Sequence, residues 1–220
     1  MTQTLSPSTR QPGTSIANAD WDEGTPAHDQ RNAPRFTLLM RAAKLIAGAG
    51  EFLVVVRDVS CDGLKVRTFH PLPPDENYAI ELSSGDRHQV EKVWQEGELN
   101  GFRFQEPVAL DQLLSESPAG KRKRPVRLQL KMPVTIFASG RRSEGLFLDI
   151  SQNGACIASD EYLALDERIR IECDGLPELT ATVRWRRRPL YGLNFEQIFR
   201  FDDLARLTAR MASAAGLTKR

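Results

Sequence analysis

The sequence is poor in the residues that bind metals or form disulfides. It has only three cysteines and three histidines among 220 residues. Cys61, Cys156 and Cys173 are odd in number and form no CxxC pair, which argues against a disulfide framework and a cysteine zinc site. The histidines are scattered along the chain, unlike the ligands of a zinc centre. We therefore expect no metal site and no cofactor.

Long hydrophobic runs are also missing. The longest strictly apolar run spans only Phe52 to Val56, whereas a helix that crosses a bilayer needs about 20 apolar residues. The first residues, MTQTLSPSTRQPGTS, lack the apolar core of a signal peptide. We expect a cytoplasmic protein without membrane insertion.

The chain has no large excess of charge of either sign. Lys and Arg number 30 and Asp and Glu 29, for a formal net charge of +1. This balance argues against a protein that coats nucleic acid. The sequence contains no GxSxG, Walker or HExxH motif, and its carboxylates are spread evenly. We do not expect an enzyme.

Residues 1–30 differ in composition from the rest. They are rich in Ser, Thr, Pro, Gly, Asn and Asp, carry a formal charge of −3, and show no apolar periodicity. This composition predicts a disordered leader.

The remainder of the chain repeats itself. Six identical residues recur 91 positions later, which predicts two copies of one unit. The first members of these pairs are Asp58, Ser60, Gly63, Trp94, Gly101 and Phe104, and the second members are Asp149, Ser151, Gly154, Trp185, Gly192 and Phe195. A linker is predicted between the copies, near SESPAG (115–120).

Each copy contains short segments rich in β-branched and aromatic residues, separated by turn sequences such as PLPPDE and SSGD. This pattern predicts an all-β, or mainly β, fold made of small closed barrels. Helix-like stretches follow at 109–116 and 202–214; in the second, Leu204, Leu207 and Met211 have the spacing of one helix face. We expect Trp94 and Trp185 to lie in the barrel cores.

Polar residues are repeated as well, although packing alone repeats only apolar positions. The first copy has Arg31, Arg35, Asp58, Ser60 and Gly63, and the second has Lys123, Arg127, Asp149, Ser151 and Gly154. Guanidinium groups suit phosphate oxygens and guanine edges, and they stack on purine faces. Aspartate accepts hydrogen bonds from guanine N–H groups, and serine donates to phosphate or base. Together these residues predict a ligand that carries both phosphate and purine.

A plainer interpretation stands beside this one. Arginines at the entry to a domain are usually solvated, and Asp and Ser after a strand often cap a turn. The recurrence of both motifs at one offset favours a binding site.

RNAPR (31–35) and DVSCDG (58–63) resemble the RxxxR and [D/N]xSxxG motifs of the PilZ family. The stretches VW…NGFRF and VRW…YGLNF are similar to that family's last two strands. The resemblance covers residues 31 to about 200 as two tandem units. It implies six-stranded β-barrels, each followed by a C-terminal helix, that bind the bacterial second messenger cyclic di-GMP. The implied boundaries are a first barrel at 31–116, a basic linker at 117–126 and a second barrel at 127–215.

The resemblance also implies ligand contacts. In the first copy, Arg31, Arg35, Asp58, Ser60 and Gly63 all match. The second copy departs because its motif is KRPVR: Lys123 replaces the first arginine, and lysine lacks the bidentate fork. Arg122 and Arg124 are neighbouring substitutes if the register slips, and Arg127, Asp149, Ser151 and Gly154 complete this set. We expect tight binding in the first copy and weak or no binding in the second.

The function expected from this resemblance is a cyclic di-GMP receptor or adaptor. Binding would order the Arg-rich segments and the domain arrangement, and so signal to an unidentified protein effector that acts in trans. Two alternatives stay open. One is a PilZ-like interaction module that binds no nucleotide. The other is a single-stranded nucleic-acid binder, which predicts steeply salt-dependent binding; the near-neutral charge counts against it, so we expect no DNA or RNA partner.

Overall fold

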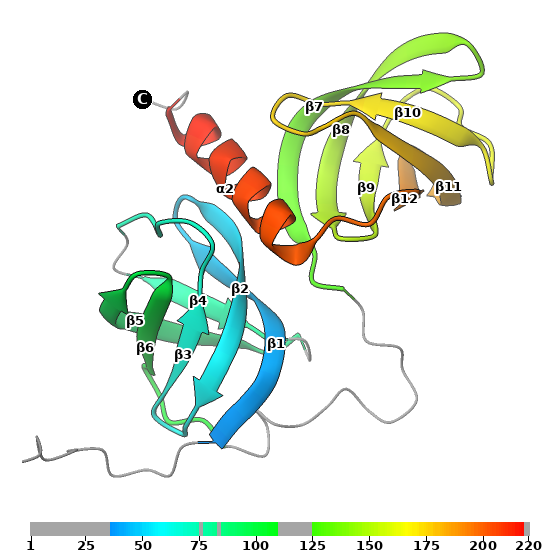
Figure 1. Cartoon of the computed structure of the whole chain (residues 1–220). Coiled ribbons are helices and arrows are strands. Elements are labelled where there is room, and N and C mark those ends of the chain that lie inside the picture. Colours follow the sequence, from blue (N-terminus) through cyan, green and yellow to red (C-terminus); the bar gives the residue numbers. More distant parts are fainter. Residues whose placement is uncertain (1–35, 75–76, 83–84, 110–124, 218–220) are drawn as a thin grey trace, which may run out of the picture. The chain divides into compact units, whose positions relative to one another are not determined.

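A computed structural model describes residues 36–74, 77–82, 85–109 and 125–217. Within these ranges the chain forms twelve strands and one helix (Figure 1). The predicted leader, most of the predicted linker and nearly all of the helix predicted at 109–116 lie outside the described residues. So do five predicted ligand residues, namely Arg31, Arg35, Arg122, Lys123 and Arg124.

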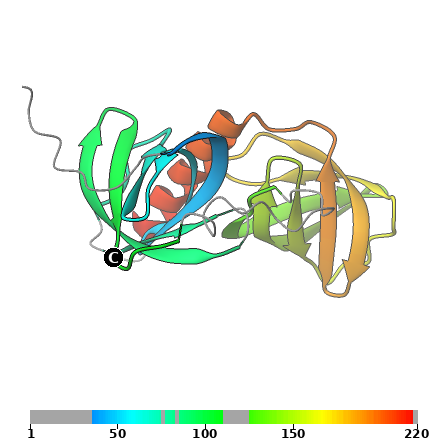
Figure 2. The ribbon, with the colours of Figure 1, turned by 90° about the horizontal axis from the view of Figure 1, so that it is seen from below.

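The first six strands close into a barrel. They are β1 (Phe36–Ala47), β2 (Gly50–Val59), β3 (Gly63–Arg67), β4 (Tyr78–Glu81), β5 (Arg87–Glu96) and β6 (Leu99–Phe104). The strand order is β1-β2-β3-β6-β5-β4, and β4 pairs back onto β1, so the sheet has no free edge. Strands β5 and β6 form a long hairpin, drawn in green in Figure 2.

The second six strands repeat this topology. They are β7 (Leu128–Ala138), β8 (Arg141–Ser151), β9 (Gly154–Ala158), β10 (Arg168–Glu172), β11 (Leu179–Arg187) and β12 (Leu190–Phe195). Their order is β7-β8-β9-β12-β11-β10, and β10 pairs with β7. The prediction of a mainly β fold with two six-stranded barrels is confirmed.

Each barrel buries its own apolar core. In the first, alternate residues of β2 face inward, so Phe52, Val54 and Val56 are at most 3% exposed. In the second, Phe147, Ile157 and Tyr191 are fully buried. Alternation of this kind builds part of each core, whereas β4 and β9 bury consecutive residues and so are covered on both faces.

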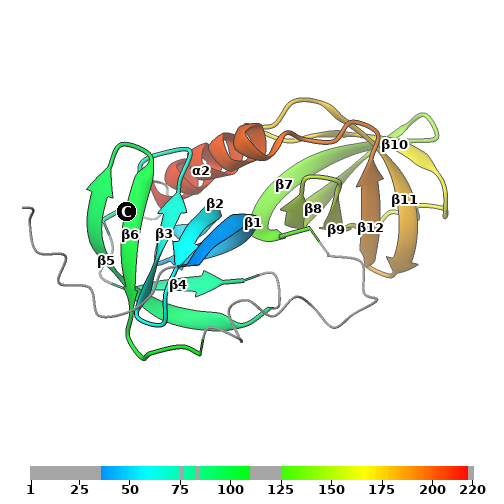
Figure 3. The same cartoon turned by 60° about the horizontal axis from the view of Figure 1, so that its bottom comes forward.

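The helix α2 (Phe201–Leu217) follows the second barrel (Figure 3). Asp202 and Asp203 lie in its first turn, where carboxylates interact favourably with the helix dipole. Leu204 and Met211 are buried as expected, whereas Leu207 is only half-buried.

Both barrels and α2 fall within one compact unit of the chain, Ala33–Arg220. Ala209 of α2 belongs to the core cluster of the first barrel, and Leu204 belongs to that of the second. The helix also approaches β2, since a Cβ at Gly50 would lie in van der Waals contact, 3.4 Å, with the Ala212 Cβ. The helix therefore shares its buried surface between the two cores.

Candidate functional site

The aspartate of the second motif lies on the outer face of each barrel because of a β-bulge. Uninterrupted alternation after Val54 and Val56 would turn Asp58 into the core. The pairing of β2 with β3 instead shifts register between Val56 and Asp58. As a result Val59 is buried at 4% exposure, and Asp58 faces outward, where its carboxylate lies 3.5 Å from the Lys65 ammonium. Bulges commonly re-aim a side chain in this way near functional sites.

The second barrel has the same bulge, between Phe147 and Asp149. Ile150 is fully buried, and Asp149 faces outward. Its Oδ1 accepts hydrogen bonds from the Arg127 guanidinium and from the Cys156 backbone N–H, the latter at 3.1 Å. Arg127 and Asp149, which belong to two different predicted motifs, are therefore in direct contact.

The serine and glycine of the motif shape the turn that follows. The Ser60 hydroxyl donates to the Gly63 carbonyl at 3.2 Å, and the Ser151 hydroxyl donates to the Gly154 carbonyl at 3.0 Å. Ser151 is only 1% exposed. These contacts give both serines a role in the turn, as the plainer interpretation of the motif expected. Ligand binding by the serines remains a prediction.

The two glycines are required by the neighbouring strand. A side chain at Gly63 would overlap the backbone oxygen of Phe102, and one at Gly154 would overlap that of Leu193. Each glycine therefore has a structural reason apart from any ligand, namely the close approach of β3 to β6 and of β9 to β12.

Backbone hydrogen bonds hold the motif turns in the same place in both barrels. The Phe104 N–H donates to the Asp62 carbonyl, and the Phe195 N–H donates to the Asn153 carbonyl, both at 2.8 Å. These bonds therefore hold the turn beside each aspartate in the same position in both barrels.

The prediction that Trp94 and Trp185 lie in the barrel cores is wrong. They are 39% and 44% exposed. A second repeated bulge explains this, because the register of β5 with β6 shifts between Lys92 and Trp94, and that of β11 with β12 shifts between Val183 and Trp185. Each shift turns the indole from the inner to the outer face.

Each exposed indole lies over a glycine. A side chain at Gly101 would overlap the Trp94 ring, and one at Gly192 would overlap the Trp185 ring. The glycine thus leaves a bare stretch of outer face that the ring covers. Sequence reasoning missed this pair as site residues; the signal was the repetition of Trp and Gly at one offset.

These residues form one row across four strands. The register pairs Asp58 with Lys65, Lys65 with Gly101, and Gly101 with Trp94; the second row is Asp149, Cys156, Gly192 and Trp185. With strands about 4.8 Å apart, each row spans about 14 Å. It presents a carboxylate acceptor at one end and an aromatic face at the other, with Lys65 or Cys156 and the covered glycine between them. This arrangement suits a flat ligand that donates hydrogen bonds.

The rows differ at their second position. Lys65 carries a positive charge, whereas burial, followed by the nearby Asp149 carboxylate, raises the pKa of the Cys156 thiol. The thiol is therefore neutral at pH 7, and the second row depends on Arg127 for its positive charge.

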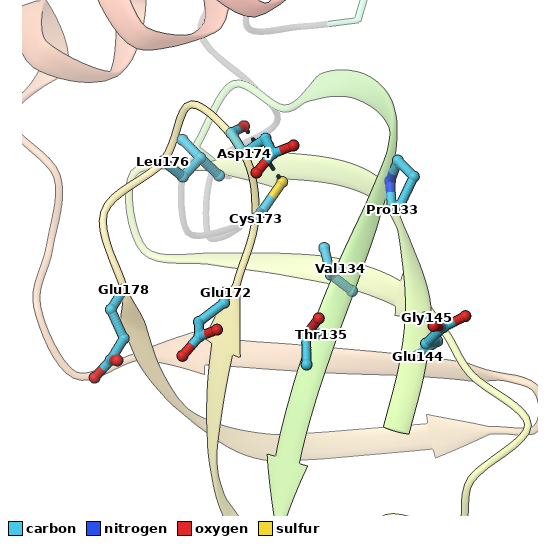
Figure 4. A pocket seen from close by; sticks show the side chains of 10 residues that line it. All are labelled: Pro133, Val134, Thr135, Glu144, Gly145, Glu172, Cys173, Asp174, Leu176 and Glu178. Atoms are coloured by element: carbon cyan, nitrogen blue, oxygen red, sulfur yellow. Dashed lines mark hydrogen bonds between the residues drawn. The ribbon is translucent and has the colours of Figure 1, made fainter. Parts of the chain in front are cut away.

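A separate pocket in the second barrel does not suit an anionic ligand. Carboxylates dominate its lining: Glu144, Glu172, Asp174 and Glu178 (Figure 4). Arg170 pairs with two of them, Glu172 at 2.9 Å and Glu178 at 2.6 Å. Cys173 also lines this pocket, and burial together with Asp174 raises its pKa to about 11, which makes the thiol unreactive.

Within the described ranges, no group of three or more His, Cys, Asp or Glu residues is arranged to hold a metal ion. The same part of the chain contains no helix long and apolar enough to span a bilayer.

Comparisons with known proteins were made for the sequence and for the fold. A model of the PilZ domain family matches residues 121–210. No curated protein matches the sequence.

Solved structures with a similar fold include PlzA of Borreliella burgdorferi in complex with c-di-GMP, at 13% identity and TM-score 0.34, covering 79% of this chain and 92% of that one. Another is the inhibitor of motility MotI/DgrA of Bacillus subtilis, at 16% identity and TM-score 0.33, covering 83% and 100%. A third is YcgR of Escherichia coli in complex with c-di-GMP, at 13% identity and TM-score 0.30, covering 81% and 86%.

The family match spans the strands of the second barrel and most of α2, and it includes Arg127, Asp149, Ser151 and Gly154. The first barrel has the same strand order and the same bulges. The match to the PilZ domain family is therefore shown for residues 121–210, which form the second barrel and most of α2.

Proposed function

We propose that this protein is a receptor for cyclic di-GMP that acts as an adaptor rather than as an enzyme. One observation carries the proposal: the outer face of each barrel presents an aspartate, a glycine and an exposed tryptophan in one row. In the second barrel, Arg127 of the RxxxR-like motif contacts the aspartate of this row. Cyclic di-GMP offers matching groups, since it combines guanine N–H donors, flat purine rings and phosphodiester oxygens.

The proposed roles follow from the chemistry of each side chain. Asp58 and Asp149 would accept hydrogen bonds from guanine N–H groups. Trp94 and Trp185 would stack on a purine, a contact worth about 1–3 kcal/mol per base in other nucleotide-binding proteins. Gly63 and Gly154 would let the ligand approach the backbone, and Ser60 and Ser151 would support the turn beside it.

The arginine clamps are proposed from the sequence. Strand β1 begins directly after Arg35, and β7 begins directly after Arg127. Because β1 pairs with β2, its start lies beside the end of β2 that carries the motif. Arg31 and Arg35 would therefore reach ligand on the first barrel, and Lys123 or Arg124 with Arg127 would reach ligand on the second.

Signalling would follow from ordering these segments. Residues 117–126 connect the two barrels, so ligand clamped by Arg127 would also constrain this connection. Binding would favour one arrangement only to the extent of its differential affinity for the alternatives. An effector protein in trans would recognise the ordered form.

A second candidate function is favoured by one observation in the second barrel. There Arg127 already pairs with Asp149, and Ser151 is buried in its turn. Both groups are thus satisfied without ligand, as expected of a PilZ-like interaction module that binds no nucleotide. Under this reading only the first barrel binds cyclic di-GMP.

The test is calorimetric titration of the full chain with cyclic di-GMP, beside Asp58→Ala and Asp149→Ala. We expect binding to the wild type, and a loss of at least about tenfold in affinity in Asp58→Ala, since hydrogen bonds to charged groups contribute about 1.5–3 kcal/mol. Asp149→Ala should have the smaller effect. If saturating ligand produces neither heat nor a shift in the unfolding temperature, the receptor function is wrong.

A further inference from the structure

Arg103 lies beside the candidate site of the first barrel but belongs to neither predicted motif. It is exposed on β6, two residues after Gly101. Residues two apart on a strand share a face, so Arg103 projects from the same outer surface as the row that ends at Trp94. Its partner in register on β3 is Gly63.

Arg103 therefore borders two positions that have no side chain. Gly101 precedes it on its own strand, and Gly63 lies opposite on the next strand. Strand contacts require at least the second of these glycines to remain bare. A ligand lying over the row between Asp58 and Trp94 would come within reach of the long Arg103 side chain.

The other cations near this row have partners. Lys65 lies 3.5 Å from Asp58, and Arg67 lies 2.7 Å from Glu98. Glu91 is the register partner of Arg103 on β5, but no ion pair or hydrogen bond of the Arg103 guanidinium is found within the described part of the chain. Its five N–H donors are therefore available to an anion.

The second barrel lacks this cation. Its equivalent residue is Asn194, which is exposed and donates to the Phe195 carbonyl at 3.3 Å. The neighbouring cation is replaced as well, because Cys156 occupies the position of Lys65. Two positive charges of the first site are thus absent from the second.

We propose that Arg103 is a phosphate-binding residue of the first barrel, and that it sets the difference in affinity and salt dependence between the two sites. This inference rests on the proposed cyclic di-GMP binding. A guanidinium fork matches the paired oxygens of a phosphodiester, and an exposed charge contact of this kind weakens as salt rises.

The experiment exchanges the two residues between the barrels. Cyclic di-GMP is titrated calorimetrically into full-length protein carrying Arg127→Ala, which weakens the second site, with and without Arg103→Asn. The loss of one charge-assisted contact predicts a fall of about tenfold in affinity at the first site. It also predicts a flatter dependence on salt between about 0.05 and 0.3 M. The reverse exchange, Asn194→Arg, made in a protein whose first site carries Asp58→Ala, should strengthen the second site.

Arg87→Asn is the matched control. It removes the same charge from the exposed surface of the same barrel, where Arg87 pairs with Glu81 at 2.9 Å. Arg103→Lys separates the effect of the positive charge from that of the bidentate guanidinium. The lysine keeps the charge, so the salt dependence should remain, but it cannot bind both oxygens of a phosphate in the same way, so affinity should fall. Thermal unfolding of each variant shows that the barrel remains folded.

If cyclic di-GMP binds and Arg103→Asn behaves like Arg87→Asn, this inference is overturned while the receptor function stands. If the wild type does not bind at all, the receptor function is overturned and this inference falls with it.

Discussion

The two barrels share a topology but differ in how they stabilise it at one equivalent position of the first strand. In the first barrel, Lys44 of β1 is 7% exposed and pairs with Glu51 at 3.3 Å and with Glu81 at 3.1 Å. The equivalent residue of the second barrel, 91 positions later, is Thr135, which pairs in register with Glu172 as Lys44 does with Glu81. The fold therefore does not require a buried charge here, and the Lys44 network is a feature of the first barrel alone.

The outer faces of the two barrels also differ in charge. The first site combines Asp58 with Lys65 and Arg103, whereas the second combines Asp149 with Cys156 and Asn194. In each case the bulges and glycines are kept and the charges change. The shared bulges and glycines are therefore features that the barrel needs, and the charges are features of one copy. The following experiments test this distinction.

The largest effect is expected from Lys44→Met. Removing the ammonium leaves Glu51 and Glu81 close together with much of their positive charge gone, which should lower the free energy of unfolding of the first barrel by about 3 kcal/mol. Thr135→Met is the matched change in the second barrel and should cost less than about 1 kcal/mol. Urea denaturation followed by tryptophan fluorescence measures both, with Trp94 or Trp185 kept as the single tryptophan. Equal losses would show that the ion pairs of Lys44 add no more stability to the first barrel than the uncharged Thr135 adds to the second.

Gly63→Ala and Gly154→Ala should have equal effects. In both, the added methyl group overlaps a carbonyl oxygen of the adjacent strand, and we expect a loss of about 2 kcal/mol from forced strand displacement. The same denaturation experiment measures it. If one barrel tolerated its alanine, the close strand approach would not be a shared requirement.

Trp94→Ala and Trp185→Ala test the sites rather than the barrels. Loss of a stacking surface should reduce cyclic di-GMP affinity at the first site by about 1–2 kcal/mol, with a smaller change at the second. Calorimetric titration gives these values. Val93→Ala is the control, since Val93 is 51% exposed on the same strand and adjoins the indole. An equal loss in Val93→Ala would remove the specific role of the ring.

The smallest effect concerns pH. Burial tends to raise the pKa of Glu81, but hydrogen bonds from Arg87 and Lys44 outweigh it and lower the pKa below its usual value of 4.5. Because the folded-state pKa is the lower one, this stabilisation is complete above the unfolded-state value and is lost as pH falls through the folded-state value. We expect less than about 1 kcal/mol from this partly exposed group.

Unfolding of the first barrel between pH 6 and 3, roughly the span around the carboxylate pKa, should show this loss of stability. Glu81→Gln should flatten that dependence; an unchanged slope would contradict the assignment.

Much of the fold was accessible from sequence because strand patterns are local. LTATVRWRR (179–187), for example, is rich in β-branched residues and forms β11, and the repeat at one offset correctly predicted two equivalent units. The contact between Arg127 and Asp149 agrees with two motifs expected to share one site. These features depend on residue type and spacing along the chain, which the sequence displays directly.

The wrong placement of the two tryptophans arose where a strand changes register. Alternation from Ala181 and Val183 places Trp185 inside the barrel, and alternation from Val54 and Val56 does the same for Asp58. In both strands one bulged residue reverses the face of everything that follows. No single residue type marks such a bulge, because it is set by how two strands pair.

The sequence by itself determined the number of units, their mainly β character and the identity of the polar motifs, since these depend on local composition and on a repeat visible along the chain. Only the tertiary structure decided which side chains share a surface. Paired bulges bring Asp58 and Trp94 to one outer face, Gly101 leaves room there for the Trp94 ring, and strand register places Arg103 beside it. The physical reason is that a β-strand has two faces, and a register shift of one residue between neighbouring strands selects which of them meets the solvent.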